Sequence, residues 1–234
     1  MSPTEQPSSD STASTVALSE YHDNALDRLF IGLFSRKMSA ATGAKTQLSG
    51  YDGFVDLSRR IARDRSPGEQ QEAIGRVLRS LVPAPVLWSI RTLFSPTQKI
   101  CEWNAWFAVQ LFAWLVGPCE VTDVEVTDAD GETRSQASGV RIHKCRYLEQ
   151  SGCVGACVNL CKAPTQAFFT DEFGIPVTMT PNFDDFSCVM SFGDVPSSPA
   201  TDPAYQQPCT AGICPSAHPH ATVCPSVRRG TRND

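Results

Sequence analysis

Residues 145–169 read CRYLEQSGCVGACVNLCKAPTQAFF and hold four of the ten cysteines of the chain. Three of them, Cys153, Cys157 and Cys161, recur at intervals of four. On an α-helix each step of four advances only about 40° around the axis, so the three sulphurs would line one face, with neighbouring Cβ atoms roughly 6 Å apart. Adjacent sulphurs could then share a metal ion or cluster.

The helix that this spacing predicts has weak intrinsic support. Ser151 is expected to cap its start, and Pro164 is expected to end it near Lys162. The residues between include glycines, β-branched residues and thiols, which are poor helix formers. A bound metal would supply the order that propensity does not.

Three further segments extend the pattern. Residues 144–169 are followed by GIPVTMTPNFDDFSCVMSFG at 174–193, by DPAYQQPC at 202–209, and by Cys214. Together they resemble the C-terminal domain of the plastid β-carotene isomerases, from about Gly117 to Cys214. Those are iron-dependent enzymes that interconvert all-trans and 9-cis β-carotene at the start of strigolactone biosynthesis.

The resemblance implies a cis/trans isomerase that acts on a carotenoid and uses iron, as an iron-sulphur cluster or as thiolate-bound iron. Thiolates are soft ligands that suit such a centre. More thiols are present than one four-ligand site needs, so they hold two sites, or one site with further cysteines packed nearby. Seven cysteines match the family and are the predicted metal ligands: Cys145, Cys153, Cys157, Cys161, Cys188, Cys209 and Cys214.

Rotation about the C9–C10 bond of a polyene requires that its double-bond character be lost temporarily. Electron withdrawal to a metal centre, transient addition of a thiolate and transient addition of a proton would each achieve this, and the first is our hypothesis. No catalytic residue is assigned.

Two functions of other classes stay open, an iron-sulphur protein that passes electrons to a partner and a structural zinc domain. Zinc is the less favoured metal, because its site would need His218, which lies in a tail where histidines are usually solvated. Its other ligands would be Cys209, Cys214 and Cys224.

Composition limits the partners. The chain has 234 residues, 41% of them hydrophobic, which is enough for one globular domain. Its net charge of −5 excludes nucleic acid, since no basic stripe is available. Six arginines between residues 59 and 79 are most simply a solvated face. The other interpretation is contact with anionic headgroups or with an acidic electron-donor protein.

The N-terminus carries no secretory signal, so the thiols are expected to be reduced and the protein not secreted. A plastid transit peptide is not evident either, because Glu5, Asp10 and Glu20 precede the first arginine, Arg28. The expected location is a plastid, as a mature form or fragment, or the cytoplasm of a photosynthetic prokaryote.

The fold class expected is α+β, with a helical N-terminal half packed on a small antiparallel sheet and a cysteine-rich metal-binding C-terminal segment. Residues 1–19 are predicted to be a disordered tail and 225–234 a flexible one. Residues 20–224 form a single isomerase-like domain, mainly helical over 20–116 and cysteine-rich α+β over 117–224.

Apolar periodicity predicts the elements. Helices are expected from about residue 21, over 53–63, from 66 to 83 with Ser66, Pro67 and Glu69 as a start signal, over 85–94 and over 96–116. Strands are expected over 120–127, 139–144, 175–180 and 189–192, with loops at 129–139 and 171–174. His143 is either a metal ligand beside Cys145 or a structural histidine.

The helix over 96–116 is rich in aromatic residues. Its uncharged run of residues 103–118 is shorter than the ~20 residues that a membrane span needs. It is a core helix, or it also lines a groove for a long apolar polyene or seats the protein at a membrane interface. The candidate substrate-binding residues are Trp103, Trp106, Phe107 and Trp114.

Overall fold

The computed structural model describes residues 19–93, 95–127, 131–210, 214 and 221–227. The tails predicted at 1–19 and 225–234 therefore fall mostly outside the described residues. At the C-terminal end the packed chain reaches Val227, which is buried.

The N-terminal half consists of helices, as the apolar periodicity predicted. They are α1 (Ala25–Thr42), α2 (Gly50–Asp64), α3 (Pro67–Leu81), α4 (Ala84–Leu93) and α5 (Gln98–Val116). The start signal of α3 is confirmed, because the Glu69 carboxylate accepts hydrogen bonds from the Ser66 amide and hydroxyl at 2.8 and 2.6 Å. Asn24 and Asp27 form the same reciprocal cap on α1, which begins four residues later than expected.

Four antiparallel strands form one sheet in the order β1-β2-β4-β3. They are β1 (Cys119–Thr127), β2 (Thr133–Ile142), β3 (Val177–Pro181) and β4 (Cys188–Phe192). The prediction of a loop over 129–139 is wrong for residues 133–139, because β2 already starts at Thr133, which pairs with Thr127. Pairing with β1 outweighs the weak strand propensity of these polar residues.

Beyond the sheet's first hairpin, α6 (Arg146–Ser151) leads into one continuous helical run. The run passes through α7 (Val154–Ala156), η1 (Cys157–Lys162), α8 (Ala163–Phe168) and η2 (Phe169–Phe173). The prediction that Pro164 ends the helix is wrong. In η1 the helix widens to a π turn, so that the Ala163 amide donates to the Val158 carbonyl five residues earlier. That wide turn accommodates the ring of Pro164 and its missing amide, which would break an α-helix.

Two neighbouring predictions also fail. Ser151 ends α6 and does not cap the cysteine-bearing helix, because Gly152 takes a left-handed conformation (φ 61°) and separates the two helices. Cys153 then lies in extended backbone just before α7. Residues 171–174 are not a loop; they are the last helical turn, which Gly174 terminates at φ 70°.

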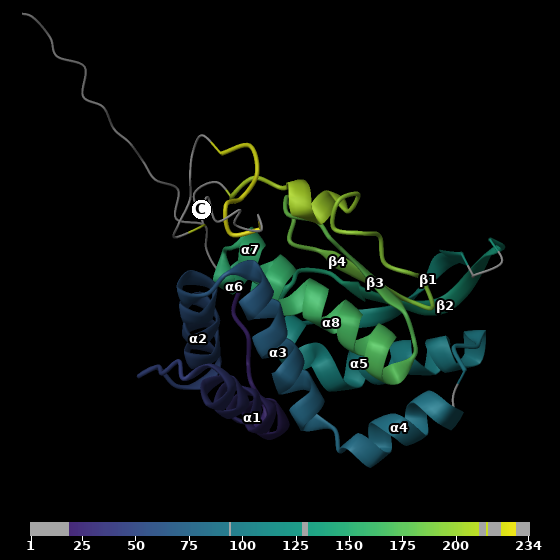
Figure 1. Ribbon diagram of the computed structural model, residues 1–234, viewed down its shortest axis with the longest axis horizontal. Coiled ribbons are helices and arrows are strands. Elements are labelled where there is room, and N and C mark those ends of the chain that lie inside the picture. Colours follow the sequence, from purple (N-terminus) through teal and green to yellow (C-terminus); the bar gives the residue numbers. More distant parts are fainter. Residues whose placement is uncertain (1–18, 94, 128–130, 211–213, 215–220, 228–234) are drawn as a thin grey trace, which may run out of the picture.

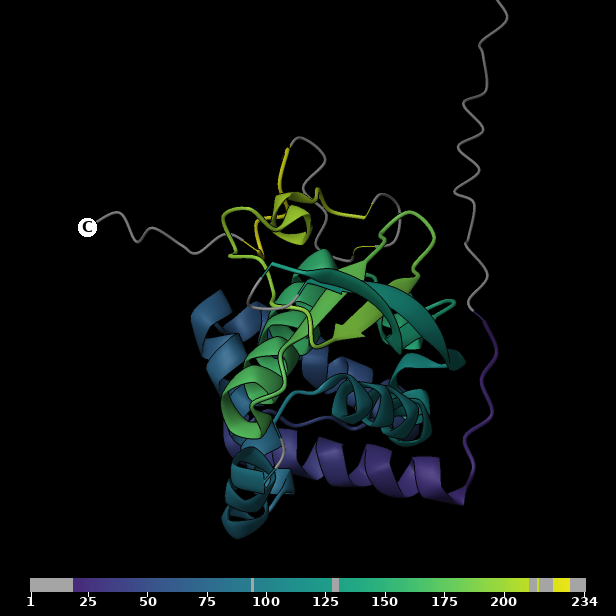
Figure 2. The ribbon, with the colours of Figure 1, turned by 90° about the vertical axis from the view of Figure 1, so that its right-hand side faces the viewer.

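The elements stack in layers (Figures 1 and 2). Helix α5 and the run from α7 to η2 lie between the sheet and α1–α3, with α5 against β1, β2 and β4, and with α8 against α3 and β3. The core lies between these layers around Ile61, Ile142 and Phe192, each no more than 1% exposed. The α+β class and the helical N-terminal half are therefore confirmed.

Candidate functional site

The sheet brings Cys145 and Cys188 to one end of the core. Cys188 begins β4 opposite Ile142, the last residue of β2, and Cys145 follows β2 at the start of α6. The Cys145 amide donates to the Phe186 carbonyl at 2.7 Å. Phe186 takes a left-handed φ of 64°, which completes the turn between β3 and β4.

Cys157 and Cys161 approach the same place from η1. We call Cys145, Cys157, Cys161 and Cys188 the inner thiol group. Burial raises the pKa of Cys145 to about 11 and that of Cys161 to about 12. It raises the pKa of Cys157 and Cys188 well above 9.0, and the charges that neighbouring thiolates would carry raise both further. Burial therefore favours the protonated form of all four thiols.

The remaining predicted ligands lie in a second cluster, the outer thiol group, which consists of Cys153, Cys209, Cys214 and Cys224. The Cys224 thiol hydrogen-bonds to the thiols of Cys153 and Cys209. Through this bond Cys153 holds the pKa of Cys224 below its usual range, while the pKa of Cys153 itself is raised. The structure thus divides the seven predicted ligands and adds Cys224, which the sequence placed only in the zinc alternative.

The C-terminal segment carries Cys224 onto α7. The Cys224 amide donates to the Gln207 carbonyl at 2.7 Å, and the Asn159 side chain donates to the Ser226 carbonyl at 2.6 Å. Val227 packs with Val154 and Val158. His218 of the zinc alternative lies outside the described residues.

Neither thiol group is a preformed site for a single ion. In the part of the chain that the structure describes, no three His, Cys, Asp or Glu side chains are placed to hold one metal ion. The predicted iron is therefore not confirmed. Four thiols are a donor set that both iron-sulphur clusters and structural zinc sites use. The His143 side chain is half exposed, and its Nε2 lies 3.4 Å from the Glu120 carboxylate.

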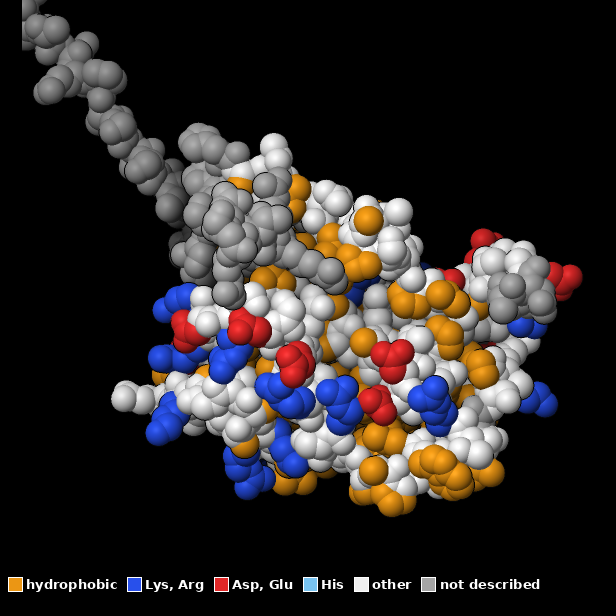
Figure 3. All heavy atoms as spheres, in the orientation of Figure 1, with side chains coloured by type: hydrophobic (Ala, Val, Ile, Leu, Met, Phe, Trp, Pro, Cys, Tyr) orange, Lys and Arg blue, Asp and Glu red, His pale blue; other side chains and the backbone are white. Residues whose placement is uncertain are grey.

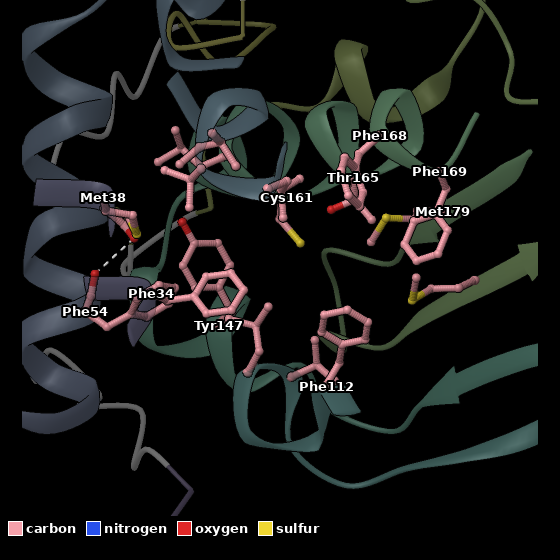
Figure 4. A pocket seen from close by; sticks show the side chains of 18 residues that line it. Phe34, Met38, Phe54, Phe112, Tyr147, Cys161, Thr165, Phe168, Phe169 and Met179 are labelled. Carbon is pink, nitrogen blue, oxygen red and sulfur yellow. Dashed lines mark hydrogen bonds between the residues drawn. The ribbon is translucent and has the colours of Figure 1, made fainter. Parts of the chain in front are cut away.

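An apolar cavity of about 90 Å³ reaches the inner thiol group (Figure 4). Cys161 forms part of its wall and lies among Phe112, Tyr147, Phe168 and Met179, with Phe34 and Met38 on the opposite side. The elements that supply this wall are α1, α2, α3, α5, α6, the run η1–η2 and strands β3 and β4.

Two more cavities continue outward from it. One of about 270 Å³ shares Phe34, Leu78 and Phe112 with the innermost cavity. The outermost, of about 180 Å³, shares Phe107 and Phe173 with the middle one. We call the three the cavity row; its members share wall residues from Cys161 at one end to the half-exposed Trp103 of α5 at the other.

The structure separates the four aromatic residues predicted to bind substrate. Trp114 is 4% exposed and packs against Phe30, Phe34 and Phe54 as a core residue at the wall of the middle cavity. Trp103 and Phe107 are about half exposed and line the outer cavities. Trp106 is half exposed and lines none of the three. Their role in substrate binding stays a prediction.

Sequence reasoning missed the ion pair beneath the inner thiol group. The Lys162 ammonium lies 2.7 Å from the Asp202 carboxylate, both side chains are buried, and the ammonium also donates to the Met179 carbonyl. Its charge lowers the pKa of Cys157 and Cys188 and so offsets part of the effect of burial. The available signal was Lys162 as the one charged residue between Glu149 and Asp171.

The chain thus has an α+β fold in which three apolar cavities share wall residues and the first of them is lined by the buried Cys161 thiol. A family model described as "Beta-carotene isomerase D27-like, C-terminal" matches residues 114–201. The chain is 41% identical over 204 residues to the chloroplastic β-carotene isomerase D27 of Medicago truncatula, covering 87% of this chain and 79% of that protein. The corresponding protein of Arabidopsis thaliana is 37% identical over 189 residues, covering 80% and 70%. The chain belongs to the D27-like β-carotene isomerase family.

No solved structure matches the chain. Across the described residues no helix has the length and apolar character to cross a bilayer.

Proposed function

We propose that this protein is a plastid carotenoid cis/trans isomerase that interconverts all-trans and 9-cis β-carotene, or a related carotenoid. The observation that carries the proposal is the cavity row, in which neighbouring cavities share apolar walls and the innermost is lined by Cys161. The names of the two relatives support both the activity and the location.

The cavity row suits one end of a polyene. Its walls are aromatic rings, methionines and aliphatic side chains, which bind hydrocarbon and exclude water. The two inner cavities, about 90 and 270 Å³, are small beside the ~300–1,000 Å³ of pockets that enclose drug-sized ligands. Because the two cavities are too small for a whole C40 carotenoid, only one end of the molecule enters them. A double bond near that end, such as C9–C10, then lies next to Cys161.

The inner thiol group is where we propose that iron is held. Its four thiols must lose their protons to bind metal, so loading releases protons and becomes easier as pH rises. The Lys162 ammonium would favour the thiolate forms of Cys157 and Cys188. When bound, such a centre supplies reversible one-electron exchange, which lowers the bond order of the polyene without net oxidation. The apolar residues of the cavity row fix the position of the hydrocarbon and exclude water from it.

The test is isomerisation of all-trans β-carotene in detergent micelles. We expect the unaltered protein to change the isomer ratio and Cys161→Ala to lower the rate at least about 100-fold. Mutation of a residue that only hydrogen-bonds to a metal ligand already lowers metal affinity or activity ~10–100-fold. Cys119→Ala is the matched control, since that thiol lies outside both thiol groups and lines no cavity of the row. Equal rates for the two variants would contradict the role of Cys161.

Metal content and the visible spectrum of anaerobically purified protein test the iron. Iron with acid-labile sulphide and broad visible absorption is the expected result, and Cys145→Ala should bleach it. Zinc with no visible band would contradict the iron proposal. Consumption of a stoichiometric oxidant during isomerisation would contradict the reversible electron exchange.

A further inference from the structure

The outer end of the cavity row opens among exposed apolar side chains. Eleven large hydrophobic side chains are exposed in the described part of the chain, and eight of them lie on α1, α4 and α5. Six of these make up what we call the apolar rim: Leu29, Trp88, Leu93, Trp103, Trp106 and Phe107. They are 48–74% exposed. Exposed apolar side chains in this number on three helices indicate an interaction site.

The rim is continuous with the cavity row. Phe107 lines both the middle and the outermost cavity, and Trp103 lines the outermost, opposite Ile90 of α4. On α1, Leu29 adjoins Phe30 and Leu33, which line the middle cavity. Figure 3 shows hydrophobic side chains gathered along the edge of the molecule where α4 lies. Whatever covers the rim therefore also covers the opening of the cavity row.

The three helices that carry the rim are more basic than the whole chain, although η2, which packs against α4, adds Asp171 and Glu172. Helices α1, α4 and α5 together carry five basic and two acidic residues, whereas the chain has a net charge of −5. The basic residues are Arg28, Arg36, Lys37, Arg91 and Lys99. Basic side chains next to exposed tryptophans are the combination that anionic lipid headgroups and the membrane interface attract.

We propose that the apolar rim docks the protein onto a lipid bilayer, with the outer end of the cavity row facing the acyl chains. This inference rests on the proposed function, because a water-insoluble C40 hydrocarbon must reach the cavity row without crossing water. The rim inserts at the interface and the basic residues stay at headgroup level, as in other proteins that lie on a membrane without spanning it. A protein partner would cover the rim but would block that passage.

Binding to vesicles tests the proposal. The variant is Trp88→Ser with Leu93→Ser on α4, two rim residues that line no cavity of the row. We expect the unaltered protein to sediment with vesicles of phosphatidylcholine and phosphatidylglycerol. The double variant should bind these vesicles at least about tenfold more weakly. The control, Val121→Ser with Val195→Ser, removes two exposed apolar side chains elsewhere and should bind like the unaltered protein.

Three results would overturn the docking proposal. The first is that the unaltered protein does not sediment with the vesicles, and the second is that both double variants lose vesicle binding equally. The third is that the unaltered protein forms a dimer in solution and the α4 variant does not, which would make the rim a contact between copies.

Isomerase activity in micelles separates this test from that of the proposed function. Activity without vesicle binding refutes the docking alone, and vesicle binding without activity refutes the proposed function alone. The α4 variant should keep its micelle activity, which also shows that it folds.

Discussion

Glu149 is a buried carboxylate that ties the start of the described chain to α6. It accepts hydrogen bonds from the amide and hydroxyl of Ser19 at 3.0 Å each and from the Tyr21 hydroxyl at 3.1 Å, and it pairs with Lys144 at 2.6 Å. Burial alone would raise its pKa, but these partners outweigh burial and lower the pKa below 4.5. The folded protein therefore binds this proton less readily than the unfolded chain does.

We predict that Glu149→Gln weakens the acid dependence of stability. With a lowered pKa in the folded state, the stabilisation from Glu149 is complete above its unfolded pKa near 4.5 and is lost as pH falls through the folded pKa. Near neutral pH the substitution should cost about 1–3 kcal/mol, a range that allows for the partial exposure of Lys144. Urea unfolding at a series of pH values measures both effects. Glu120→Gln, at an exposed carboxylate, is the control, and identical pH profiles for the two variants would refute the prediction.

The cysteines show what spacing predicts and what it leaves out. Intervals of four correctly singled out Cys157 and Cys161, which lie together on η1. The same spacing grouped Cys153 with them, but Gly152 breaks the helix and the Cys153 thiol meets Cys224 instead. The loops decide which cysteines that are far apart in the sequence come into contact. The spacing of cysteines within one segment carries no information about the path of those loops.

Gly155 is the point where the C-terminal segment crosses α7. A Cβ at this position would lie 2.4 Å from the Ser226 Cβ and 3.2 Å from the Ser226 carbonyl carbon. Backbone cannot yield as a flexible side chain can, so only glycine permits this crossing.

We predict that Gly155→Ala displaces residues 224–227 from α7 and destabilises the protein by about 1–3 kcal/mol. Limited proteolysis should then cut the C-terminal segment faster, and Cys224 should react faster with a thiol reagent. Gly75→Ala in α3 is the matched control, because its nearest contact is the flexible Arg79 guanidinium at 3.7 Å. That change should stabilise the helix slightly. Equal proteolysis of the two variants would contradict the crossing.

Amphipathic periodicity predicted the N-terminal helices because each buries one face and its caps are local in sequence. Two elements could not be predicted in that way. The π turn before Pro164 has no periodicity signal of its own, and the start of β2 depends on its pairing with β1. The cavity row was also beyond prediction, since its wall combines residues from eight or more separate elements.

The cavity row makes the stability of the whole molecule depend on its ligand. Apolar walls without a ligand forgo dispersion contacts, so a hydrocarbon that fills the cavities stabilises the folded state by linkage. A ligand at about 100 times its dissociation constant contributes about 2.7 kcal/mol. For a chain of this size that corresponds to a rise in Tm of about 5–10 °C.

We therefore predict that a saturated C40 hydrocarbon, which cannot isomerise, raises the Tm of the protein by about that amount. The reference is the Tm in the same detergent micelles without the hydrocarbon. Leu78→Phe should largely abolish the rise, because Leu78 lies in the wall shared by the two inner cavities and the larger ring takes up space in both. Leu48→Phe, the same exchange at a side chain 57% exposed, should keep it. A rise that persists in Leu78→Phe would place the hydrocarbon elsewhere on the protein, and the cavity row would lose its role as the carotenoid site.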